Sequence, residues 1–138
     1  MQYTHRTLFA QPIDADWVRQ LSTRDDLGEK LDAFVGRFSR LQDHIGEKLL
    51  PRFAALLGDS PKSILDVLAY AERMQWVENA EAFMGARKLR NLLVHEYMSD
   101  TKLFVDALLS ARAAVDMLFR TVAATEKEAA TRGLPTNL

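Results

Sequence analysis

The amino-acid sequence predicts an all-α fold, an antiparallel bundle of four to five helices. Apolar residues recur every three or four positions along most of the chain, which is the spacing of one helix face. No stretch shows the sustained polar and apolar alternation that is typical of a β-strand. With 138 residues, 48% of them hydrophobic, and no cysteine, we expect a single domain (1–138) with one core and no disulfide.

Residues 1–25 are expected to form a short leading segment that covers the core. Within it, Asp14 can cap a helix that carries Trp17, Val18 and Leu21 on one side. The longest helical pattern then runs from near Arg24 to Leu50. Its apolar stripe consists of Leu31, Phe34, Phe38, Leu41, Ile45 and Leu49.

Proline and glycine predict where the next helices begin and end. Pro51 interrupts the hydrogen-bond ladder, so we expect a kink or a restart there, and Gly58 then ends the helix. Ser60 and Pro61 predict the start of a third helix, as N-cap and first helical residue. We expect its short apolar face to consist of Ile64, Leu65 and Leu68.

Two further helices complete the predicted bundle. The first extends from about Asn79 to Tyr97, and Ser99–Asp100 separate it from the last helix. The apolar stripe of that last helix consists of Phe104, Leu108, Ala111, Val115, Leu118 and Val122. Charged residues and then Gly133 and Pro135 follow, so residues 126–138 are expected to be a loose tail.

The helix from Asn79 to Tyr97 has apolar residues on two sides. One side, centred on Leu89, also carries Ala82, Gly85, Ala86, Leu92, Leu93 and Glu96, and we expect it to face the core. The opposite half mixes apolar and polar groups: Phe83, Met84, Val94 and Met98 with Arg87, Arg90, Asn91 and His95. Burial on both sides predicts contact with a second copy of the chain in a symmetric dimer.

The polar residues of this helix form a candidate anion site. Asn91 and His95 are one helical turn apart, and Arg87 extends the same row one turn back, so all three can converge on one anion. Arg90 lies about 140° from His95 around the helix. That separation favours a composite site across a dimer axis.

The string Arg90-Asn91-Leu92-Leu93-Val94-His95-Glu96-Tyr97 resembles a family signature. In the HepT-like branch of the HEPN superfamily the motif is R-x4-H-x-Y with a polar residue after the arginine, and here Arg90, Asn91, His95 and Tyr97 match it. The resemblance extends over about residues 30–121. It implies a HEPN-like helical domain in a dimeric, metal-independent ribonuclease, the toxin of a toxin–antitoxin pair.

The resemblance also implies roles for the matching residues. His95 acts as general base or acid at the RNA 2′-hydroxyl, Arg90 binds the scissile phosphate, and Asn91 orients phosphate or histidine. Cleavage leaves a cyclic phosphate and requires no metal or other cofactor. Tyr97 accepts adenylate from a minimal nucleotidyltransferase antitoxin, and this bulky anion beside His95 repels RNA phosphate. The chain has no nucleotidyltransferase motif, so that partner is another polypeptide.

Other interpretations stay open at this stage. The same branch includes proteins described as substrate-binding subunits of a minimal nucleotidyltransferase, which makes a non-catalytic regulatory subunit the second hypothesis. The third is a helical interaction module in which the motif is accidental. In these interpretations His95 is an interface histidine, Arg90 pairs with Glu96 or Asp100, and Tyr97 only packs. We interpret Arg87 as a solvated helix charge, and Trp76 as packing rather than as a platform for bases.

Charge and hydropathy limit the partners and the location. The net charge of −1 provides no bulk basic field, so any RNA site must be local. The stretch Met1 to Ala10 lacks the apolar segment of a secretory signal, and no later run approaches bilayer length. These features predict a cytoplasmic protein with no membrane partner.

Overall fold

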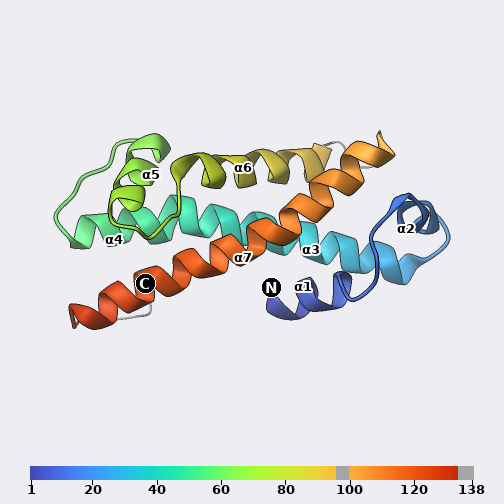
Figure 1. Ribbon diagram of the computed structural model, residues 1–138, viewed down its shortest axis with the longest axis horizontal. Helices are drawn as coiled ribbons and strands as arrows, with labels where there is room; N and C mark the ends of the chain where they lie inside the picture. The colour runs from blue at the N-terminus through green and yellow to red at the C-terminus, as the bar shows by residue number, and fades with distance from the viewer. Residues whose placement is uncertain (96–99, 134–138) are drawn as a thin grey trace. The chain divides into compact units, whose positions relative to one another are not determined.

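The computed structural model describes residues 1–95 and 100–133, apart from the side chains of Val94 and His95. Every regular element in these ranges is helical, which confirms the all-α prediction. In chain order (Figure 1) the elements are α1 Gln2–Leu8, α2 Ala15–Gln20, α3 Asp25–His44, the π-helical turn η1 Ile45–Leu49, α4 Leu50–Leu56, α5 Ile64–Arg73, α6 Ala80–His95 and α7 Thr101–Thr131.

The chain divides into two compact units, each built from two separate stretches. The first consists of Met1–Leu41 and Ala86–Val115, and the second of Gln42–Gly85 and Asp116–Leu138. The boundary between the units falls within α3, α6 and α7, so these helices contribute residues to both.

In the first unit, the leading segment contains a helix that the sequence analysis did not expect. Leu8 of α1 is fully buried, and the imidazole Nε2 of His5 lies 3.2 Å from the carbonyl oxygen of Arg112 on α7. Phe9, directly after α1, packs edge-on against Phe34 of α3, with ring centroids 5.3 Å apart. Arg37 donates a hydrogen bond to the buried Thr4 hydroxyl. These contacts attach α1 to both α3 and α7.

The predicted cap of α2 is confirmed. The Asp14 carboxylate accepts a hydrogen bond from the backbone N–H of Trp17 at 2.9 Å. Trp17, Val18 and Leu21 are buried, as their spacing indicates. A carboxylate at this position satisfies one of the backbone donors that a helix N-terminus leaves without an internal partner.

The expected interruption before Pro51 takes the form of the π-helical turn η1. The backbone N–H of Leu50 donates to the carbonyl of Ile45, five residues earlier rather than four. Pro51 has no N–H, and in an α-helix its ring would clash with the carbonyl of Glu47. The wider π turn accommodates the proline, and the chain continues into α4 without leaving the helical region.

Gly58 ends α4 as predicted, in a left-handed conformation with φ of 89°. The N–H of Asp59 donates to the carbonyl of Ala54 and that of Gly58 donates to Ala55, which together form a Schellman motif. A side chain at Gly58 would be strained at this φ, so the glycine has a conformational role.

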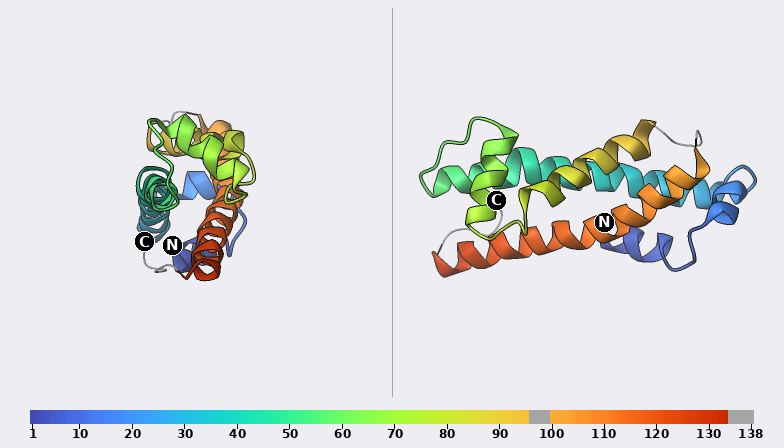
Figure 2. Two further views of the ribbon diagram at one scale, coloured as in Figure 1. Left: turned by 90° about the vertical axis from the view of Figure 1, so that its left-hand side faces the viewer. Right: turned by 45° about the horizontal axis from the view of Figure 1, so that its top comes forward.

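The predicted start of the third helix is wrong. Ser63, not Ser60, is the N-cap of α5, and its hydroxyl accepts the N–H of Asp66 at 3.1 Å. With this start, α5 buries Val67, Leu68 and Ala71 and leaves Leu65 63% exposed. In the second unit α5 packs against η1 and α4, which the right-hand view in Figure 2 shows.

Helix α7 extends further than expected. Its buried row follows the predicted stripe to Leu118 and then continues through Thr121, Thr125 and Ala129 rather than through Val122. The helix runs to Thr131, so the first part of the expected tail is helical. In the described part of the chain, no helix combines the length and apolar character needed to cross a bilayer.

Candidate functional site

Two side chains fix the start of α6, the helix that carries the motif. The Asn79 amide oxygen accepts the backbone N–H of Ala82, and the Glu72 carboxylate accepts that of Ala80, both at 2.6 Å. An acidic group at this end also interacts favourably with the helix dipole. The predicted start at Asn79 is therefore correct to within one residue, and α5 supplies one of the two caps.

The buried side of α6 coincides only in part with the predicted one, because Ala86 and Leu93 lie on the predicted core side and Phe83 does not. The predicted centre, Leu89, is only partly buried, whereas Phe83, Ala86 and Leu93 are at most 2% exposed. At 100° per residue these three lie about 40° to 120° around the helix from Leu89. Arg90, at about 100° from Leu89, falls within the same sector. The prediction that Phe83 lies opposite the core is therefore wrong.

The structure brings together two of the predicted site residues, Arg90 and Asn91. Arg90 is partly buried, and solvent does not reach its Nε. Its NH1 donates a long hydrogen bond of 3.4 Å to the amide oxygen of the exposed Asn91. The guanidinium and the amide therefore lie next to each other on α6, as an anion site would require.

The other two predicted site residues lie at the limit of the described structure. His95 is the last described residue of α6, and its backbone is described but its side chain is not. Tyr97 lies outside the described residues. Helix geometry places His95 about 7.5 Å along the axis from Arg90 and about 140° around it. The shared site across a dimer axis remains a prediction.

The side chain of Arg87 is less exposed than its interpretation as a solvated helix charge predicts. The side chain is partly buried, and its NH1 is shielded from solvent with no hydrogen-bond acceptor among the described residues. Its neighbour Lys88, by contrast, is exposed. The helical wheel predicted the opposite, because it placed Arg87 far from Leu89, the assumed centre of the core side.

The cations of α6 form a local positive cluster. Arg87, Lys88 and Arg90 lie within four residues, and the sequence has no acidic residue between Glu81 and Glu96. The chain as a whole carries a net charge of −1, so this segment departs strongly from the average. A local cluster of this kind is the electrostatic feature that an RNA site needs on a nearly neutral protein.

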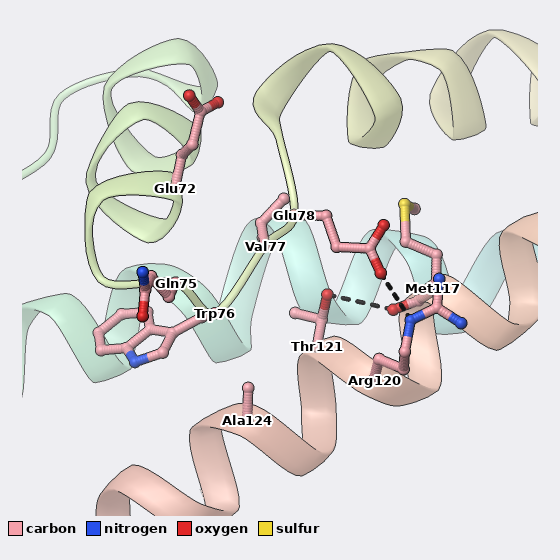
Figure 3. A pocket seen from close by; sticks show the side chains of 9 residues that line it. All are labelled: Glu72, Gln75, Trp76, Val77, Glu78, Met117, Arg120, Thr121 and Ala124. Atoms are coloured by element: carbon pink, nitrogen blue, oxygen red, sulfur yellow. Dashed lines mark hydrogen bonds and ion pairs between the residues drawn. The ribbon is translucent and has the colours of Figure 1, made fainter.

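The second unit contains a separate groove of about 510 Å³ (Figure 3). Its lining residues come from the end of α5, from the α5–α6 connection and from α7: Glu72, Gln75, Trp76, Val77, Glu78, Met117, Arg120, Thr121 and Ala124. Glu78 and Arg120 reach toward each other and form an ion pair of 2.7 Å. Both carboxylates of the groove are engaged, since Glu72 caps α6. We therefore do not assign acid–base chemistry to this groove.

Trp76, which lines this groove, belongs to the core rather than to a base-stacking surface. It is 4% exposed and packs edge-on against Phe53, with ring centroids 4.7 Å apart, and against Tyr70. The preceding residue, Gln75, has a left-handed φ of 64°, and the N–H of Trp76 donates to the carbonyl of Ala71. This Schellman turn at the end of α5 directs the indole inward and confirms the interpretation as packing.

The search for metal ligands and the comparisons with known proteins give no further information on the site. Within residues 1–95 and 100–133 no group of three or more His, Cys, Asp or Glu side chains could hold a metal ion. No family model matches the chain, and no curated protein or solved structure is significantly similar to it. The functional interpretation therefore depends on the residues of α6 themselves.

Proposed function

We propose that this protein is a HepT-like member of the HEPN superfamily and acts as a metal-independent endoribonuclease, the toxin of a toxin–antitoxin pair. The observation that carries the proposal is the motif on α6. Arg90 lies on the partly buried side of the helix next to Asn91, and the described part of the helix extends to His95. The positive cluster around Arg90 supports RNA as the substrate.

Two residues carry the proposed reaction. The always-protonated guanidinium of Arg90 binds the scissile phosphate and stabilises the negative charge that develops on it. His95 removes the proton of the neighbouring 2′-hydroxyl, whose oxygen then attacks the phosphorus. The bond to the 5′-oxygen breaks, a proton is returned to that oxygen, and a cyclic phosphate remains. An imidazole suits both proton transfers because it titrates near neutral pH.

The geometry of a single α6 favours a site shared between two protomers. A separation of about 140° keeps Arg90 and His95 of one helix on different sides, whereas a two-fold axis can bring Arg90 of one protomer to His95 of the other. The active form in this proposal is therefore a symmetric dimer with two equivalent sites.

Control of the toxin completes the proposal. A minimal nucleotidyltransferase antitoxin transfers adenylate from ATP to the hydroxyl of Tyr97, two residues after His95. The phenol oxygen bonds to the α-phosphorus and loses its proton, and pyrophosphate leaves. The added phosphate and nucleoside block the site sterically and repel the RNA backbone. The alternative is that the chain is a non-catalytic substrate-binding subunit of that nucleotidyltransferase, in which the same residues bind without cleaving.

RNA cleavage in the presence of EDTA tests the proposal. Wild type is expected to cleave a mixed-sequence single-stranded RNA, and His95→Ala is expected to lose at least about 100-fold in rate because the proton acceptor is removed. His44→Ala, at an exposed position on α3, is the matched control and should cleave normally. Cleavage by His95→Ala at the wild-type rate would refute the site. No cleavage by wild type would instead favour the binding subunit.

Mixing two inactive variants tests the shared site. In a one-to-one mixture of Arg90→Ala and His95→Ala protomers, half of the dimers are mixed, and each contains one intact composite site. The mixture is therefore expected to recover about a quarter of the wild-type rate. No recovery, with mixed dimers confirmed by differently tagged chains, would place the site within one protomer.

A further inference from the structure

Arg87 presents an unmet hydrogen-bonding requirement on the same side of α6 as the motif. It lies about 60° around the helix from Arg90 and about 40° from Asn91, so the three side chains occupy one sector. NH1 of Arg87 is shielded from solvent and has no acceptor among the described residues. None of the described ion pairs includes Arg87.

A shielded guanidinium nitrogen without an acceptor is unfavourable. Arginine cannot lose its charge at ordinary pH, and a buried polar group that lacks a partner destabilises the fold. Buried polar groups in proteins therefore nearly always have a partner. The sequence offers none nearby on α6, since no acid lies between Glu81 and Glu96. A bound anion that contacts the other guanidinium nitrogens, which are not shielded, would neutralise this charge.

We infer that Arg87 is a second phosphate-binding arginine of α6, which holds an RNA phosphate adjacent to the one bound by Arg90. This inference rests on the proposed RNA function and extends it by one residue. Arg87 binds and positions the strand, and the chemical step remains with Arg90 and His95. The planar guanidinium suits this role because two of its N–H groups can bind two oxygens of one phosphate.

The salt dependence of RNA binding measures the role of Arg87 directly. Each phosphate contact to single-stranded RNA contributes about 0.7 to the slope of log K against log salt concentration. The experiment uses a short fluorescein-labelled RNA and a His95→Ala background, so that the RNA stays intact. Fluorescence anisotropy between about 50 and 200 mM KCl gives both the affinity and the slope.

Arg87→Met is compared with Lys88→Met, which removes the same charge from an exposed neighbour. Arg87→Met is expected to weaken binding about tenfold and to lower the slope by about 0.7, and Lys88→Met is expected to change either quantity by less than half as much. Equal effects of the two variants would overturn the inference, because they would show that only general charge matters. Failure of the parent to bind RNA would overturn it as well.

The thermal melting temperature separates a binding role from a structural one. Arg87→Met keeps the apolar stem and removes the nitrogen without an acceptor, so it should melt at or above the temperature of its parent. If Arg87→Met melts at a lower temperature than its parent, Arg87→Lys is tested instead, since lysine keeps the charge but not the planar fork of the guanidinium. Unchanged RNA affinity in folded Arg87→Lys would then overturn the inference.

The two proposals fail in different ways. If wild type cleaves RNA and Arg87→Met binds RNA with unchanged affinity, the inference about Arg87 is refuted and the ribonuclease proposal stands. If wild type does not cleave RNA but binds it, and Arg87→Met loses this binding, the ribonuclease proposal is refuted and the inference of a phosphate site at Arg87 stands.

Discussion

Polar atoms that are shielded from solvent are satisfied differently in α7 and in α6. On α7, Thr121 and Thr125 are at most 2% exposed, and each hydroxyl donates to a carbonyl of its own helix, Thr121 to Met117 at 3.3 Å and Thr125 to Val122 at 2.8 Å. On α6, NH1 of Arg87 has no acceptor among the described residues. The threonine hydroxyls of α7 therefore have their partners within the fold, whereas NH1 of Arg87 has none, and we propose that a bound phosphate compensates this arginine.

Gln42 provides a third case that sharpens this contrast. It is fully buried near the end of α3, and neither its amide nitrogen nor its amide oxygen has a partner among the described residues. Unlike Arg87 it is uncharged and fully enclosed, so no ligand from outside can reach it. We therefore expect Gln42 to destabilise the protein and Arg87 to be compensated by binding.

The largest expected effect is on the apolar side of α6. Phe83→Ala removes a fully buried ring and should lower the free energy of unfolding by about 3–5 kcal/mol. Urea unfolding followed by circular dichroism measures this loss. Arg87→Met, one helical turn after Phe83, should leave the free energy of unfolding unchanged or slightly raised. A loss as large as that of Phe83→Ala would show that Arg87 also serves the fold.

An intermediate effect, of opposite sign, is expected at Gln42. Gln42→Leu replaces an amide without partners by an apolar side chain of similar size, and should raise the free energy of unfolding by about 1–3 kcal/mol. Thr121→Val is the matched variant on α7. It removes a satisfied hydroxyl and should lower the free energy of unfolding by about 1 kcal/mol.

The opposite result at Gln42 would be informative in the same urea experiment. A destabilised Gln42→Leu protein would show that the amide is satisfied by an internal water molecule, which the variant displaces. The contrast between Gln42 and the α7 threonines would then disappear.

The smallest expected effect is at the start of α3, where the Arg24 guanidinium donates to the Asp26 carboxylate at 3.0 and 2.8 Å. This hydrogen bond lowers the pKa of Asp26, and the same pair raises the pKa of Arg24. Because the carboxylate pKa is lower in the folded state, the stabilisation is present above the unfolded pKa of Asp26 and is lost as pH falls through its folded pKa.

Arg24→Ala should therefore raise the pKa of Asp26 toward its ordinary value, as followed by NMR titration of the carboxyl group. Both side chains are more than half exposed, so the variant should hardly change the free energy of unfolding at neutral pH. An unshifted pKa would show that the pair does not persist in solution.

The features that sequence analysis predicted correctly are those set by local chemistry. Asp14 caps α2, Gly58 ends α4, and the α-helical hydrogen-bond pattern is interrupted before Pro51. Each depends on the backbone within a few residues, where proline, glycine and a capping carboxylate have strong preferences. For the motif, the sequence placed Arg90 next to Asn91 on a helix, and the structure adds a hydrogen bond between them.

The incorrect predictions concern choices between locally similar options. Ser60 with Pro61 is as good a helix start as Ser63 by local rules, yet the helix begins at Ile64, where Val67, Leu68 and Ala71 become buried. Helix α1 is seven residues long, and its contacts with α3 and α7 hold it in place. A helix this short gains too little from its own hydrogen bonds to be stable alone.

The sequence by itself determined the helical class, the cap of α2, the end of α4, the start of α6 and the position of the motif, because these depend on short-range preferences and on the period of apolar residues. Only the tertiary structure decided that Phe83 lies on the buried side of α6 and that NH1 of Arg87 is shielded from solvent. The physical reason is that α6 carries apolar residues on both sides. The choice between them depends on what packs against the helix, and those neighbours come from distant parts of the chain.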